Sequence, residues 1–169
     1  MIGRLWYPQL DAYDAVRRMA GLLAIWDTSA PPSPERLYIA DFYLANPPLL
    51  HMTHMSRAER LAFNGLGVTR PEKAFVSFPT PPVLFQKMAE VQREAFRTLS
   101  GKGLIDLSAL EGGLVRPSAA GGEIFSDKFL PLLSAFERDL TAFLAGSFCA
   151  GADGIGGLRR STGLRRAGQ

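Results

Sequence analysis

Residues 80–117 read TPPVLFQKMAEVQREAFRTLSGKGLIDLSALEGGLVRP, and this stretch decides the predicted fold. Its first half carries apolar residues at the spacing of one helix face: Leu84, Met88, Val91, Ala95 and Leu99. Thr80 can accept a hydrogen bond as the N-cap, and Pro81 suits the first helical position because it lacks an N–H. The pattern predicts an amphipathic helix over residues 82–99.

The second half of the stretch has the pattern of a β-hairpin. Gly101 and Gly103 can end the helix in a left-handed conformation. Residues 104–107 (LIDL) predict a strand, 111–113 (EGG) a turn, and 114–115 (LV) a return strand. A helix followed by a glycine-tipped hairpin is typical of a winged helix. We therefore predict a mainly α fold, a winged helix-turn-helix domain with a small β-hairpin wing and additional N- and C-terminal helices.

Four further helices follow from caps and apolar spacing. Asp11 can cap a helix that runs to about Trp26, with Arg17 and Arg18 opposite its apolar side. Ser33 and Pro34 start a second helix, apolar almost all round, which predicts a central helix of the core. Ser56 and Glu59 form a capping box for a short helix, residues 57–64. A last helix is predicted over residues 123–145, with Pro131 either kinking it or marking a break between two segments.

The chain divides by composition at about residue 145. Residues 1–145 carry 15 basic and 15 acidic residues, and residues 146–169 carry four arginines and one aspartate, so the net charge of +3 comes from the end of the chain. That end repeats GLRR, at 157–160 and 163–166, and is rich in glycine. We predict one winged-helix domain over 1–145 and a disordered Gly/Arg-rich tail over 146–169.

No pattern of catalytic or cofactor-binding residues stands out in the sequence. The single cysteine, Cys149, has no histidine near it in sequence, and His51 and His54 lack further metal ligands at a familiar spacing. Phosphate-binding glycine loops and hydrolase motifs are missing as well. We expect a non-enzymatic protein without metal or cofactor. A signal peptide and an apolar stretch of membrane-spanning length are not evident, so we expect a cytoplasmic protein that does not contact membranes.

Basic residues form two candidate nucleic-acid contacts. One set lies on the predicted recognition helix and wing: Lys87, Arg93, Arg97 and Lys102. The other lies in the tail: Arg159, Arg160, Arg165 and Arg166. Glu90 and Glu94 on the same helix would repel phosphates, so a solvated mixed-charge face and a protein contact are alternatives to DNA binding.

Aromatic residues supply the candidate protein interface. Aromatic side chains contribute much of the binding energy at protein contacts. The candidates are Tyr13, Trp26, Tyr38 and Tyr43. The alternative is that all four belong to the core or its edge.

Several short motifs, in this order and spacing, resemble a known family. They are Tyr7-Pro8, Asp11-x-Tyr13, residues 36–44 (RLYIADFYL) and residues 102–105 (KGLI). The chain resembles the middle components of bacterial three-component ABC-ATPase systems, the group that includes Lamassu-type antiphage defence. The resemblance implies a winged-helix adaptor that is encoded beside an SMC-like ABC ATPase and an effector.

Two functions follow as expectations. The first is a non-catalytic adaptor that links the ATPase to the effector in antiphage or anti-plasmid defence. A homodimer is compatible with this role, and DNA would be contacted only through the complex. The second is a stand-alone winged-helix DNA-binding transcriptional regulator, which would need a basic surface on the helix and wing.

Overall fold

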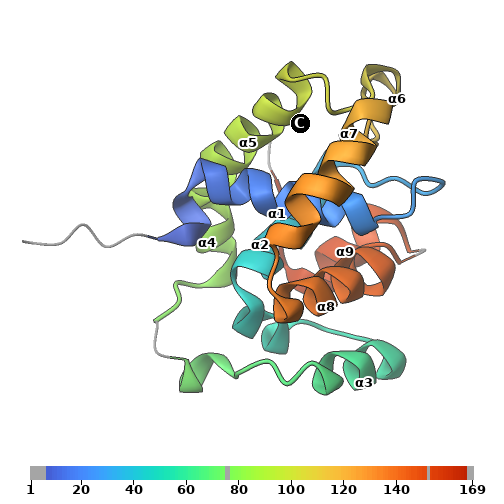
Figure 1. The fold of residues 1–169 in the computed structure, drawn as a ribbon. Helices are drawn as coiled ribbons and strands as arrows, with labels where there is room; N and C mark the ends of the chain where they lie inside the picture. The colour runs from blue at the N-terminus through green and yellow to red at the C-terminus, as the bar shows by residue number, and fades with distance from the viewer. Residues whose placement is uncertain (1–6, 75–76, 152, 167–169) are drawn as a thin grey trace, which may run out of the picture.

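The computed structural model describes residues 7–74, 77–151 and 153–166, and these residues form helices joined by short loops (Figure 1). The elements follow in chain order as η1 (Pro8–Leu10), α1 (Ala12–Ile25), α2 (Pro34–Ala45), η2 (Pro47–Met52), α3 (Arg57–Gly65), η3 (Pro71–Lys73), α4 (Pro81–Lys87), α5 (Ala89–Gly101), α6 (Leu107–Glu111), α7 (Ala119–Ile124), η4 (Phe125–Phe129), η5 (Leu130–Leu132), α8 (Ala135–Phe143), η6 (Leu144–Phe148) and α9 (Gly154–Thr162).

The first two helices begin at the caps that the sequence indicates. Asp11 accepts hydrogen bonds from the N–H groups of Tyr13 and Asp14, and Ser33 accepts one from Arg36. Helix α1 packs against α2, α5, α8 and η4, so it is the hub of the fold. Helix α2 is buried on nearly all sides, which confirms the prediction of a central helix.

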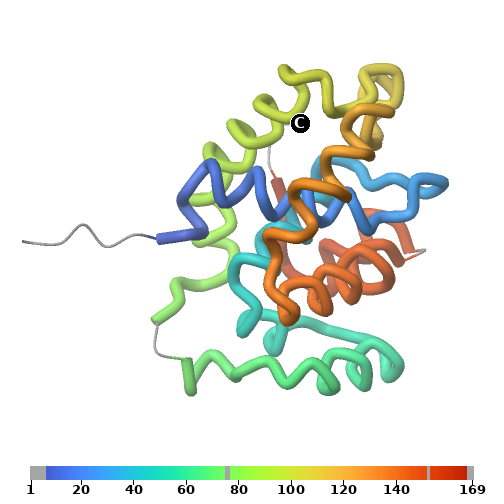
Figure 2. Tube along the Cα trace, viewed as in Figure 1, coloured from blue at the N-terminus to red at the C-terminus, as the bar shows by residue number. Residues whose placement is uncertain are grey.

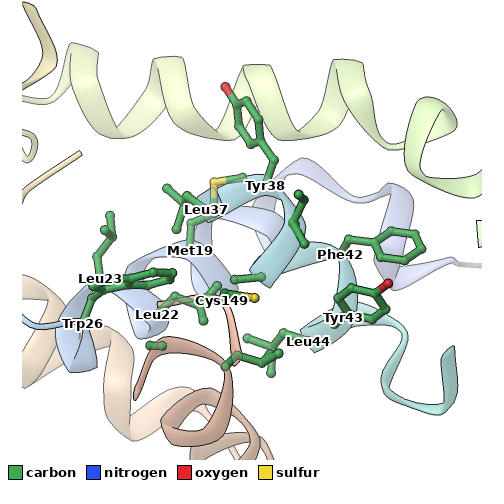
Figure 3. Packing of buried hydrophobic residues seen from close by; sticks show 14 of the residues in the cluster. Met19, Leu22, Leu23, Trp26, Leu37, Tyr38, Phe42, Tyr43, Leu44 and Cys149 are labelled. Carbon is green, nitrogen blue, oxygen red and sulfur yellow. The ribbon is translucent and has the colours of Figure 1, made fainter. Parts of the chain in front are cut away.

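The hydrophobic core lies between α1, α2, α5 and the C-terminal helices. Met19, Leu22 and Leu23 of α1 and Leu37 and Phe42 of α2 belong to one cluster of buried side chains, in which Met19 lies beside Leu37 (Figure 3). Each such side chain contributes about 1.5–3 kcal/mol when it is removed from water, so the packing of these two helices is a large part of the folding free energy.

The predicted helix over residues 82–99 forms as two helices, α4 and α5, that meet at Met88. The apolar stripe is buried as expected at Leu84, Met88, Ala95 and Leu99. Thr80 occupies the N-cap position, but its side chain makes no capping hydrogen bond. The predicted apolar face is therefore confirmed, whereas the predicted cap interaction is wrong.

The predicted β-hairpin wing is wrong. Residues 107–111, expected to form the end of a strand and the start of a turn, form helix α6. Asp106 explains the difference, because its carboxylate accepts hydrogen bonds from the N–H groups of Ser108 and Ala109 and so caps a helix. Within the described residues the only strand-like pairing is a single antiparallel bridge between Ile105 and Pro117.

The backbone bonds around this bridge show why no wing extends from it. Asp106 N–H donates to Arg116 and Ser118 N–H to Leu104, but Val115 N–H donates to Pro32 in the loop before α2. The return segment is thus tied to the body of the protein instead of to a hairpin partner. A winged helix-turn-helix with a β-wing is not supported for the part of the chain that the structure describes.

The segment after the bridge is held by a close backbone approach. Residues 118–122, which the sequence suggests to be a flexible joint, are the cap and first turn of α7, with Ser118 accepting from Gly121 N–H. A Cβ placed on Gly121 would lie 1.9 Å from the carbonyl oxygen of Leu104. Only glycine fits at this crossing.

The predicted interruption at Pro131 is confirmed, and it takes the form of a break between two segments. Helix α7 continues through η4 into the short turn η5, which contains Pro131, and α8 starts anew at a capping box between Ser134 and Glu137. The break lets the chain reverse, so that α8 packs against α1.

The described part of residues 146–166 is folded, which differs from the predicted disordered tail. Phe148, Cys149, Leu158 and Leu164 are buried, and α9 packs against α2. This segment has too few apolar residues for a core of its own, but it buries them against a body that is already assembled. Arg166, the last residue that the structure describes, bonds to Gln92 of α5, and the described C-terminal residues lie beside this helix (Figures 1 and 2).

Candidate functional site: a buried polar network and the surrounding surface

Three of the four candidate interface aromatics belong to the core. Trp26, Tyr38 and Tyr43 are all less than 5% exposed. In Figure 3 the Tyr38 side chain points toward α5, where its ring lies 6.2 Å from that of Phe96, centroid to centroid. Burial raises the pKa of Tyr43 above its ordinary value, with a smaller contribution from Cys149. For these three residues the alternative interpretation, a role in the core, is the one that the structure supports.

Tyr13 is the candidate that lies on the surface. It is 89% exposed on the first turn of α1. Tyr7, directly before η1, and Leu10, the last residue of η1, are 45% and 42% exposed and precede Tyr13 closely in sequence. These three residues form the N-terminal apolar surface, a surface on which an aromatic side chain is available for a protein contact.

The basic candidates divide into engaged and exposed residues. Arg93 pairs with Glu90 at 3.1 Å, Arg159 pairs with Glu35, and Arg166 is buried. The remaining five are exposed: Lys87, Arg97, Lys102, Arg160 and Arg165. The eight candidates therefore do not form the single basic face that a DNA reader usually has. The alternative of a winged-helix regulator also loses the wing on which it depended.

A buried polar network begins at Arg18 of α1. Its Nε donates to Asp41 Oδ1 at 2.7 Å, and its Nη1 donates to Asp14 Oδ2 at 2.5 Å. Arg18 and Asp41 are both buried. Burial alone would lower the pKa of Arg18, but the charges and hydrogen bonds of Asp41 and Asp14 outweigh burial and raise it. The guanidinium thus stays charged inside the core and joins α1 to α2.

Gln92 of α5 extends the network. Its side-chain Nε2 donates to Asp41 Oδ2 and to the carbonyl oxygen of Tyr38, both at 2.9 Å. Its Oε1 accepts from Arg166 Nη2. The amide therefore uses both ends and connects α2, α5 and the C-terminal segment. Buried hydrogen-bond networks of this kind favour one arrangement of the helices over others.

Arg18 and Gln92 are functional positions that were not predicted from the sequence. Arg18 was expected opposite the apolar side of the first helix, but it lies three residues after Ala15 and four before Leu22, on the same face. Gln92 lies four residues after Met88 and three before Ala95. A polar residue at a core position of the helical repeat was the available signal.

Cys149 and His51, the side chains that could act as a nucleophile or a metal ligand, are engaged in structural contacts. Cys149 is fully buried, and burial raises the pKa of its thiol, so the reactive thiolate is disfavoured. His51 Nε2 lies 2.7 Å from the carbonyl oxygen of Val68, and the His51 ring lies 4.8 Å from that of Phe63. In residues 7–74, 77–151 and 153–166 no three His, Cys, Asp or Glu side chains gather in a way that could hold a metal ion.

A polar cavity of about 350 Å³ opens between the start of α3 and α9. Its lining carries charged side chains of both signs, Arg36, Glu59 and Asp153, together with His54.

A comparison with protein families identifies the family of this chain. A family model described as ABC-three component (ABC-3C) system Middle Component 5, MC5, matches residues 4–167. The chain belongs to the MC5 family. An MC5 protein is a middle component of an ABC-3C system, so ABC components are its partners. The match confirms the predicted resemblance to middle components of three-component ABC systems.

Two further comparisons give no relative of this MC5 protein. Neither the search of curated proteins nor the search of solved structures finds a match. None of the helices in the described residues combines the length and apolar character that a membrane crossing needs.

Proposed function

We propose that this MC5 protein is the non-catalytic adaptor subunit of its ABC-3C complex. In this proposal it binds an SMC-like ABC ATPase and links it to an effector that acts against phage or plasmid DNA. The observation that carries the proposal is the family match over residues 4–167, which makes the chain a middle component along nearly its whole length.

The positions of the reactive side chains support a role without catalysis. Cys149 is buried under α2, and His51 is bound to a backbone carbonyl and packed on Phe63. Arg18, Asp41 and Gln92, the polar groups that converge most closely, satisfy one another inside the core. These groups have structural partners, which suits a protein that acts by binding.

The N-terminal apolar surface is the proposed docking site for an ABC component. Tyr13 offers a large aromatic ring to solvent at the start of α1, the helix that contacts most of the core. A partner that covers Tyr13 would thus be connected directly to the hub of the fold. DNA contact is proposed to occur in the complex, where the exposed arginines Arg97, Arg160 and Arg165 can add to a basic surface of the partner.

Co-expression with the ABC ATPase encoded beside it tests the adaptor proposal. The tagged protein alone should hydrolyse neither ATP nor DNA, and it should retain the ATPase through size-exclusion chromatography. Tyr13→Ser should weaken this retention while leaving the circular dichroism spectrum unchanged. Leu61→Ser is the matched control, since Leu61 is 75% exposed on α3. Failure of the wild-type protein to retain the ATPase would contradict the proposal.

A further inference from the structure

The two GLRR segments meet at one carboxylate. The first lies in α9 and the second follows its end, and each buries its leucine, Leu158 or Leu164. Arg159 of the first segment donates its Nε to Glu35 Oε1 at 3.0 Å, and its Nη2 pairs with Oε2. The backbone N–H of Arg166, in the second segment, donates to the same Oε1 at 3.1 Å. The repeat therefore has a structural meaning, because both copies dock on Glu35 of α2.

The side chain of Arg166 enters a site that we name the arginine cage, formed by Glu35, Tyr38, Phe85 and Gln92. Its guanidinium carbon lies 3.9 Å from the centroid of the Phe85 ring and 5.4 Å from that of Tyr38. Nη1 donates to the carbonyl oxygen of Phe85 at 3.0 Å, and Nη2 donates to Gln92. Aromatic faces combined with fixed acceptors are what a protein uses to bind an arginine side chain.

Gln92, the side-chain acceptor of the cage, is oriented by partners other than Arg166. Gln92 Nε2 is held by Asp41 and by the Tyr38 carbonyl, so its Oε1 stays aimed into the cage. Asp41 is in turn held by Arg18 from α1. An acceptor that is oriented from behind in this way is preorganised, and preorganisation increases affinity for a ligand. The buried polar network thus supports a binding site as well as the helix packing.

The segment that fills the cage is held only by its side chains and a few backbone bonds. Residues 163–166, which we name the C-terminal strap, have no regular secondary structure and start at Gly163 with a φ of 72°. Leu164 and Arg166 are buried, whereas Arg165 between them is exposed. Within the described residues, Arg166 Nε has no hydrogen-bond partner, and burial lowers the pKa of Arg166 to about 10. The cage therefore binds the arginine of this strap incompletely.

We propose that the arginine cage is a binding site for a Leu-x-Arg segment of a partner ABC component, and that the C-terminal strap is the intramolecular ligand that this segment displaces. The proposal rests on the adaptor function proposed above. The spacing comes from the strap itself, in which a buried leucine precedes the caged arginine by two residues. Displacement leaves Glu35 and Gln92 open to water or to the incoming arginine, and both are polar groups that water can solvate.

A labelled peptide of residues 161–169 (STGLRRAGQ) tests the cage on the full chain. The variant Arg166→Ala, with its cage vacated, should bind the peptide about tenfold more tightly than the wild-type chain in fluorescence anisotropy. Arg165→Ala is the matched control, since it removes the same charge from an exposed neighbour and should bind like the wild type. A peptide with lysine in place of Arg166 should bind Arg166→Ala about tenfold more weakly, because a lysine cannot stack and donate in the same way.

Hydrogen exchange on the wild-type chain gives a second measurement that needs no variant to fold. Excess peptide should speed exchange of the amides of residues 163–166 and leave those of α1 and α2 unchanged. Equal peptide binding by Arg166→Ala and Arg165→Ala, or an unchanged exchange rate of the strap, would overturn the proposal. These assays contain no ATPase, so they are independent of the co-expression experiment that tests the adaptor function. If the peptide does not bind but the protein retains the ATPase on co-expression, the cage proposal alone is rejected. If the peptide binds but the ATPase is not retained, the adaptor function alone is rejected.

Discussion

Arg18 of α1 donates to Asp41 of α2 across 2.7 Å, and both side chains are buried in the core. This pair joins the two helices that pack at the centre of the fold, and it is the point from which the network reaches Gln92 and the C-terminal strap. Buried ion pairs contribute little net stability, but the removal of one partner leaves an uncompensated charge. The consequences of that asymmetry can be measured.

Substitution of Arg18 by methionine should strongly destabilise the protein. The change leaves Asp41 buried without its cation, which costs about 3–5 kcal/mol in the free energy of unfolding. Urea denaturation followed by circular dichroism measures the effect. Arg17→Met is the control, because Arg17 lies on the same helix and pairs with Asp14 and Glu137 near the surface. The Arg17→Met change should lower the free energy of unfolding by less than about 1 kcal/mol.

The double variant Arg18→Met with Asp41→Leu separates charge from packing. Removal of both partners abolishes the unpaired charge, so the double variant should be more stable than Arg18→Met alone. Additive losses from the two single changes would show that the pair is not coupled.

Glycine-to-alanine changes at neighbouring positions of α7 should have opposite effects. Alanine at Gly121 would place its Cβ 1.9 Å from the carbonyl oxygen of Leu104, so the backbone must shift, at a cost of about 1–3 kcal/mol or more. Alanine at Gly122 meets no atom within 4 Å and should stabilise the helix by up to about 1 kcal/mol. Thermal unfolding of the two variants makes the comparison, and equal melting temperatures would contradict the close approach.

Acid should weaken the attachment of the C-terminal segment. Burial raises the pKa of Glu35, but the hydrogen bonds and charges of Arg159 and Arg166 outweigh it and hold the pKa below its ordinary value of 4.5. The stabilisation by Glu35 is therefore present above about pH 4.5 and is lost as the pH falls through the lowered pKa.

A comparison of the wild type with Glu35→Gln isolates this effect. Asp27 and Asp106 also have lowered pKa values, but they are present in both proteins and cancel in the difference. The wild type should have the higher melting temperature at pH 7, and the gap should narrow toward pH 3. A gap that stays constant with pH would show that the Glu35 charge does not hold the segment.

Substitution of Trp26, a candidate in the core, and of Tyr13, the exposed candidate, should change the free energy of unfolding by different amounts. Trp26→Ala empties a core position and should cost about 3–5 kcal/mol. Tyr13→Ala changes an exposed side chain and should alter stability by less than about 0.5 kcal/mol. Chemical denaturation of both variants tests whether Tyr13 is available for binding rather than for folding.

Much of the helical framework follows from local sequence signals. The caps at Asp11, Ser33 and Ser56 and the break at Pro131 lie where the sequence predicts them. Each depends on hydrogen bonds or a missing N–H within a few residues, so no distant contact is needed to predict it. The resemblance to middle components of three-component ABC systems also came from short motifs along the chain, whereas the MC5 family was identified by the family comparison.

The β-hairpin prediction failed because two local signals competed. The apolar residues at 104–107 and the glycines at 112 and 113 suit a hairpin, but Asp106 followed by residues 107–111 also suits a capped helix. The contacts that decided between them are distant in sequence. Val115 donates to Pro32, and Gly121 packs on Leu104, so the segment closes onto the body of the protein.

The sequence by itself determined the positions of most helices, the apolar faces that they bury, and the resemblance to middle components of three-component ABC systems. Only the tertiary structure decided the roles of Arg18, Gln92 and Arg166, and it gave the C-terminal segment a folded position. The physical reason is that a buried charge or amide is stable only where distant partners satisfy it, and those partners come from α1, α2, α5 and the end of the chain.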